Sequence, residues 1–87
     1  MTTIQKCRII AEVVKKHGTP LTLPDSYGYY GVEVVRTKGR HHIILPFVLN
    51  VSFGVRSVKF YGDGGDAEKF QSVLDILFNQ LSRLADV

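Results

Sequence analysis

The sequence has no tryptophan and only one cysteine, Cys7, among its 87 residues. A single thiol cannot form an intramolecular disulfide, and its position on an apolar helical stripe indicates a small buried side chain rather than a nucleophile. No apolar run reaches 18 residues, which argues against a membrane span, and the N-terminus lacks the charged and apolar regions of a signal peptide. We therefore expect a cytoplasmic protein that does not enter a membrane.

Acidic residues are absent between Glu33 and Asp63, although the net charge of the whole chain is only +3. From residue 60 to the end, by contrast, acidic side chains outnumber basic ones. This division favours one surface for an anionic partner and another surface for a different contact. The acid-free interval contains five cations: Arg36, Lys38, Arg40, Arg56 and Lys59.

The length predicts a single domain over residues 1–87, and a hydrophobic content of 45% is enough for a small core. A helix is expected over residues 2–17, where Thr2 and Gln5 fit a capping box and Gly18 fits the C-terminal end. A second helix is expected from Ala67 to about Leu84, with Asp66 as its N-cap. Residues 19–29 are rich in helix and strand breakers, so we expect an irregular connector.

Two strands are predicted over residues 30–37 and 40–49, joined by a two-residue turn at Lys38-Gly39. A third strand is predicted over residues 55–61. The order is then α-β-β-β-α, an α+β fold with a three-stranded antiparallel sheet covered on one face by two helices. The turn opposes Arg36 to His41 and Val35 to His42. Since side chains alternate along a strand, His41 should face the core and His42 the more open face.

The adjacent histidines at the start of the second strand are the first candidate for chemistry. Because neighbouring strand residues point to opposite faces, His41 and His42 are poorly placed to chelate one metal, and we expect neither a metal nor a cofactor. Imidazole titrates near neutrality, so one of them suits general acid or base catalysis, and the geometry favours His42. The alternative is that both are ordinary polar residues.

The five cations of the acid-free interval are the second candidate. Several cations on one surface suit the binding of phosphate, and Tyr30 or Tyr61 nearby could stack on a base. The alternative is a solvated hairpin whose charges discourage edge-to-edge aggregation. We interpret Arg36, Lys38, Arg40, Arg56 and Lys59 as contacts to RNA or DNA.

The run from Gly31 to Ile44, with Gly39-Arg40-His41-His42 at its centre, resembles the start of HicA-type (YcfA-like) mRNA interferase toxins. In that family Gly-Ser-His-His or Gly-Ser-Asn-His opens a strand, and Arg40 stands here in place of the serine. The resemblance implies a double-stranded-RNA-binding-like fold, metal-independent endoribonuclease activity and an antitoxin partner. The second histidine of the motif is the catalytic one, which corresponds to His42.

A second resemblance uses the same order of elements. Tyr30-Gly31-Val32, a hairpin centred on Gly39 and a strand leading into the Ala67-Glu68 helix are similar to plant ethylene-response and phage-integrase arm-binding domains. That resemblance implies a sheet that enters the DNA major groove. A third hypothesis is a small phage or plasmid protein that inhibits a host machine through its acidic C-terminal helix or its tyrosine-rich connector. The sequence does not set the oligomeric state.

Overall fold

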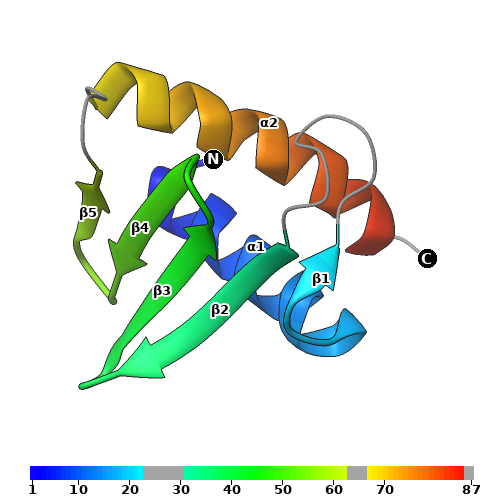
Figure 1. The fold of residues 1–87 in the computed structure, drawn as a ribbon. Helices are drawn as coiled ribbons and strands as arrows, with labels where there is room; N and C mark the ends of the chain where they lie inside the picture. The colour runs from blue at the N-terminus through cyan, green and yellow to red at the C-terminus, as the bar shows by residue number, and fades with distance from the viewer. Residues whose placement is uncertain (23–30, 63–66, 86–87) are drawn as a thin grey trace.

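A computed structural model of the chain describes residues 1–22, 31–62 and 67–85. It contains two helices and one antiparallel sheet whose strands lie side by side in the order of the sequence, β1-β2-β3-β4-β5 (Figure 1). The predicted α+β class is confirmed, whereas the predicted count of three strands is wrong. The elements are α1 (Thr3–His17), β1 (Leu21–Thr22), β2 (Gly31–Thr37), β3 (Arg40–Leu45), β4 (Leu49–Phe53), β5 (Val58–Tyr61) and α2 (Ala67–Ala85).

Helix α1 begins with the capping box that the sequence predicted. The Gln5 backbone N–H donates to the Thr2 hydroxyl at 3.2 Å, and the Thr2 backbone N–H donates to the Gln5 side chain at 2.7 Å. These two bonds satisfy amide groups that have no partner inside the helix. The predicted N-cap of α2, Asp66, and the loop before it lie outside the described residues.

The hairpin of β2 and β3 forms with the predicted register. Lys38 and Gly39 both have positive φ, 52° and 79°, as a type I′ turn requires. Val35 pairs with His42, and Arg36 pairs with His41. The turn therefore fixes which histidine points to each face of the sheet.

The predicted second strand, residues 40–49, is in fact two strands. β3 ends at Leu45, and a turn over residues 46–48 reverses the chain into β4. Pro46 has no N–H to give to the sheet, and Phe47 takes a φ of 64°, so the extended run cannot continue. This turn was not predicted because Pro46 is the only strand-breaking residue in an otherwise apolar run.

Two other predicted elements also differ. Leu21 and Thr22 pair with Val32 and Gly31, so the connector that we expected to be irregular contains a short edge strand, β1. The rest of that connector, residues 23–29, and residue 30 of the predicted first strand lie outside the described part of the chain. The predicted third strand begins at Val58 rather than residue 55, because residues 54–57 form the connection after β4.

The core lies between the two helices and one face of the sheet. From the sheet, Val32, Ile43 and Val51 are fully buried, and Phe60 of β5 stacks on Phe70 of α2 with ring centroids 5.9 Å apart. Both helices therefore cover the same face, as predicted. Neither of the two helices in the described part of the chain lies on the opposite face (Figure 1). The helix residues with no exposed surface are Cys7, Ile10, Val14, Leu74, Leu77 and Leu81.

An ion pair joins the helices near the N-terminus of α1. Lys6 Nζ lies 2.7 Å from Asp75 Oδ1, and the two side chains are 22% and 42% exposed. Gln71 Nε2 donates to the same carboxylate oxygen at 3.3 Å. The hydrogen bond from Lys6 is the largest effect on the pKa of Asp75 and lowers it from the ordinary 3.8, although partial burial acts in the opposite direction.

Replacing Asp75 with asparagine should lower the free energy of unfolding by about 0.5 kcal/mol at neutral pH, since water screens a half-exposed pair. A carboxyl group whose pKa is depressed by folding stabilises the protein above its unfolded pKa, and this contribution is lost as the pH falls through the folded pKa. The difference between the two proteins should therefore vanish well below pH 3.8. Urea denaturation of both proteins at neutral pH and at a pH well below 3.8 measures this difference in the free energy of unfolding. An equal loss in a Lys6→Gln background would show that the pair contributes nothing.

Within residues 1–22, 31–62 and 67–85, neither helix has the length and apolarity to cross a membrane.

Candidate nucleic-acid interface

The helix-free face of the sheet gathers polar side chains from all five strands. Strand pairing and alternation place twelve described residues on it. Glu33 is the only carboxylate on this face within the part of the chain that the structure describes. The residues of the helix-free face are Thr22, Gly31, Glu33, Val35, Thr37, Arg40, His42, Ile44, Asn50, Ser52, Lys59 and Tyr61.

One row across this face contains the predicted catalytic residue. His42 pairs with Val35 on one side and with Ser52 on the other, and Ser52 pairs in turn with Lys59. His42 and Lys59 are thus two strand spacings apart, about 9.5 Å between backbones. His42 is half-buried and Lys59 is exposed, so both side chains can reach a group that lies between them above this face.

Arg40 lies beside this row and is fixed by hydrogen bonds within the protein. Its Nε donates to Ser52 Oγ at 2.8 Å, and one terminal nitrogen donates to Ser57 Oγ at 2.8 Å. The other terminal nitrogen donates to the backbone oxygens of Ser52 and Ser57, at 3.2 and 3.3 Å. Four of the five N–H groups of a guanidinium are then in use. Arg40 supplies a fixed positive charge to the face, with one donor left over.

The position of the Arg40 side chain explains the burial of Ser52 and the presence of glycine at position 54. Ser52 is 1% exposed although it is on the helix-free face, because the Arg40 side chain covers it. A Cβ on Gly54 would lie 3.0 Å from the nearest Arg40 nitrogen, so a glycine there leaves room for the guanidinium. The Gly54 N–H donates to the Ser57 oxygen at 3.0 Å and closes the β4–β5 connection.

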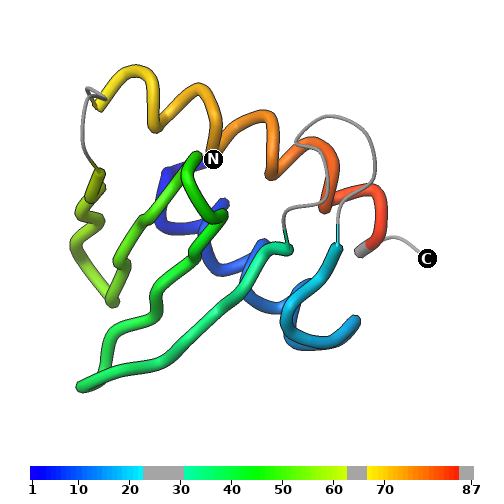
Figure 2. Tube along the Cα trace, viewed as in Figure 1, coloured from blue at the N-terminus to red at the C-terminus, as the bar shows by residue number. Residues whose placement is uncertain are grey.

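Lys38 and Arg56 lie in two turns at one end of the sheet. Lys38 is in the β2–β3 turn and Arg56 is in the β4–β5 connection, and both are exposed. Because β3 and β4 are antiparallel with His41 opposite Phe53, these two turns are at the same end (Figure 2). We call this the turn end. It adds two cations next to Arg40.

Arg36 is separated from the other predicted contacts. It shares the helix-covered face with its pairing partner His41, although it remains exposed. The His41 ring stacks on Phe53 with centroids 5.2 Å apart and an interplanar angle of 19°. The structure therefore groups His42, Lys38, Arg40, Arg56 and Lys59, and places Arg36 elsewhere.

Sequence reasoning did not single out Ser52, Arg8 or Lys15. Ser52 had no flanking motif, and only the pairing of β3, β4 and β5 places it between His42 and Lys59. Arg8 and Lys15 are seven positions apart on α1 and so share one helix face, which was a usable signal for a cation-lined surface.

Cysteine and metal chemistry find no support in the described residues. Cys7 is buried, and burial raises the pKa of its thiol to about 11, so that very little thiolate exists at neutral pH. Over the ranges that the structure covers, no three histidine, cysteine or acidic side chains come close enough to hold a metal ion.

The fold and this surface together define a two-layer α+β domain whose second sheet face is covered by neither described helix and carries Arg40, His42 and Lys59. Comparisons of the chain with family models, with curated proteins and with solved structures found no match.

Proposed function

We propose that the chain binds RNA through the helix-free face and that His42 contacts the phosphodiester backbone. The observation that supports this most is the strand register, which aligns His42, Ser52 and Lys59 in one row beside Arg40. Because the Arg40 side chain covers Ser52, a phosphate bound between His42 and Lys59 would lie over the fixed guanidinium of Arg40. Charge-assisted hydrogen bonds of this kind are the stronger ones in phosphate recognition.

The remaining features of the face suit a strand of nucleic acid better than an isolated ion. Tyr61 is 47% exposed on the same face and offers an aromatic ring for base stacking. Lys38 and Arg56 extend the positive charge to the turn end. The resemblance to HicA-type toxins assigns the catalytic role to the same histidine, and an imidazole in contact with a phosphodiester can act as general acid or base in RNA cleavage.

Binding is tested with a fluorescent single-stranded RNA titrated at several salt concentrations. With about four cations engaged, log Kd should change with log salt with a slope of about 3. Lys59→Gln should weaken binding about fivefold and reduce that slope by about 0.7. Lys16→Gln on α1 removes an equally exposed charge away from the face and should change neither quantity. Equal effects of the two variants, or tighter binding to duplex DNA of the same length, would refute the proposal.

Cleavage is tested separately. His42→Ala should abolish RNA cleavage and the growth arrest caused by expression, while RNA binding falls less than threefold, because a single hydrogen bond is lost. His41→Ala is the neighbouring comparison and should leave any cleavage by folded protein intact. Absence of cleavage by the parent chain, or cleavage by the His42 variant, would refute the proposed catalytic role of His42. The proposed RNA binding is tested independently by the salt titration.

A further inference from the structure

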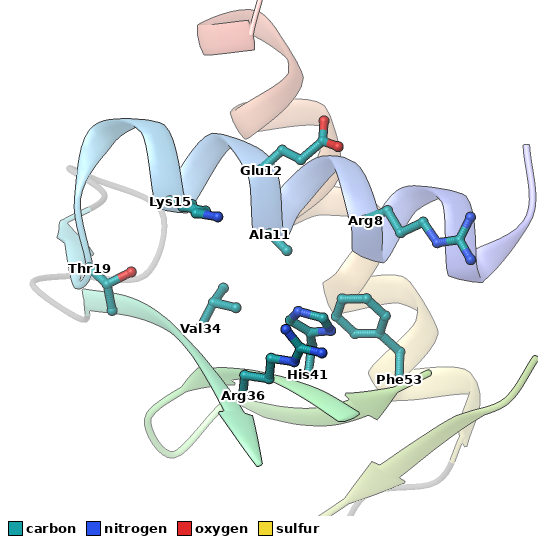
Figure 3. A pocket seen from close by; sticks show the side chains of 9 residues that line it. All are labelled: Arg8, Ala11, Glu12, Lys15, Thr19, Val34, Arg36, His41 and Phe53. Atoms are coloured by element: carbon teal, nitrogen blue, oxygen red, sulfur yellow. The ribbon is translucent and has the colours of Figure 1, made fainter. Parts of the chain in front are cut away.

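A cavity of about 460 Å³ opens between α1 and the helix-covered face of the sheet, on the opposite side of the sheet from the proposed RNA surface. Figure 3 shows α1 along one wall and side chains of β2, β3 and β4 rising from the other. Its size is in the range of cavities that hold small molecules. None of the residues that surround it is on the helix-free face.

Three cations surround the opening. Arg8 and Lys15 come from α1 and Arg36 from β2, and all three are exposed. The side chains of these three residues form no ion pair or hydrogen bond with another described residue. Glu12 is the one acidic residue of the lining, and in Figure 3 its carboxylate is turned away from the sheet. The cavity therefore has an excess of positive charge that a bound anion would neutralise.

The floor of the same cavity is apolar and aromatic. Ala11, Val34 and Phe53 line it, and the imidazole of His41 lies on Phe53 in a stacked arrangement. Phe53 is 3% exposed, so its position is fixed by the core, and it holds the His41 ring in turn. In Figure 3 the Arg36 guanidinium and the His41 ring are neighbours at one end of the cavity. A rigid planar surface next to unpaired cations suits a ligand with both a flat ring and an anionic group.

We propose that this cavity binds a nucleoside phosphate, with the phosphate held by Arg36, Arg8 and Lys15 and the base placed against His41 and the apolar floor. A simple anion would leave the floor unused, and a neutral ring compound would leave three cations unpaired. A nucleoside phosphate carries an anionic group for the cations and a flat ring for the apolar floor. This inference does not depend on the proposed RNA surface, since the two sites share no residue.

The test is a calorimetric titration of the full chain with AMP, GMP, CMP and UMP, and separately with inorganic phosphate and the matching nucleosides. At least one nucleotide should bind about tenfold more tightly than its nucleoside and than phosphate, because the two contacts act together. Phosphate binding as tightly as every nucleotide would show a site for anions only, and no heat with any nucleotide at millimolar concentration would refute the proposal.

Two pairs of variants connect the binding to this cavity. Lys15→Gln and Arg36→Gln should each weaken nucleotide binding about fivefold, as expected when one charge-assisted contact is lost. Their controls, Lys16→Gln and Arg83→Gln, remove exposed charges of the same type outside the cavity and should have no effect. All four positions are exposed, so the variants should fold. Lys59→Gln should leave nucleotide binding unchanged, which separates this result from the RNA titration. Equal losses in the variants and their controls would refute the assignment.

Discussion

Replacing Leu77 with alanine should lower the free energy of unfolding by about 3 kcal/mol, within the range seen for leucines in well-packed cores. Leu77 is in the middle of α2 and has no exposed surface. Its shortening removes apolar contacts and leaves a cavity that the helix cannot close, because the buried Leu74 and Leu81 hold it in place on either side. A domain of this size has a total stability of about 5 to 10 kcal/mol, so the loss is a large part of it.

Urea denaturation followed by circular dichroism measures this loss as a shift of the midpoint at constant slope. Ile76→Ala is the matched control, since Ile76 is the adjacent residue of the same helix and is 47% exposed. It should cost less than about 1 kcal/mol, because only about half of the Ile76 surface is buried and no enclosed cavity is left. Equal losses at the two positions would contradict the packing of α2 against the sheet.

Replacing Arg40 with methionine should lower the free energy of unfolding by about 2 kcal/mol, because four hydrogen bonds are lost together. Two of them go to Ser52, which is buried, and the other two hold the β4–β5 connection at Ser57. A methionine would cover Ser52 without offering it a donor. The bonds to Ser57 are exposed and contribute less, since water can replace them.

The control for Arg40→Met is Arg56→Met, which removes an exposed arginine from the same β4–β5 connection and should change stability by less than about 0.5 kcal/mol. Arg40→Lys retains the charge but cannot reach all four acceptors, so it should recover less than half of the loss. Full recovery by lysine would show that charge alone matters at this position and that the observed hydrogen bonds do not.

The parts of the fold that were predictable have strong local causes. The β2–β3 hairpin follows from a turn in which Gly39 tolerates positive φ, and this turn fixed the faces of His41 and His42. The helices follow from apolar periodicity and, in α1, from the capping box. Each of these signals lies within a few residues of the element it specifies, so no tertiary information was needed.

The parts that were not predictable depend on distant contacts or on a weak local signal. β1 has only two residues and exists because β2 lies beside it. The turn at Pro46 lies inside an apolar run whose hydrophobicity matches a strand throughout. The same limitation applies to the site. No local pattern predicts that Arg40 donates hydrogen bonds to Ser52 and Ser57, or that Arg36 lines a cavity with Arg8 and Lys15 from another element.

The order of the strands in the sheet has a consequence for how the chain reaches this structure. Every described strand pairs only with strands adjacent to it in the sequence, so the whole sheet can assemble through short loop closures. The two helices, by contrast, meet across almost the full length of the chain, as Lys6 and Asp75 show. The longest loop closure in folding is therefore the docking of the first and last segments, and we expect it to follow the local pairing of the strands.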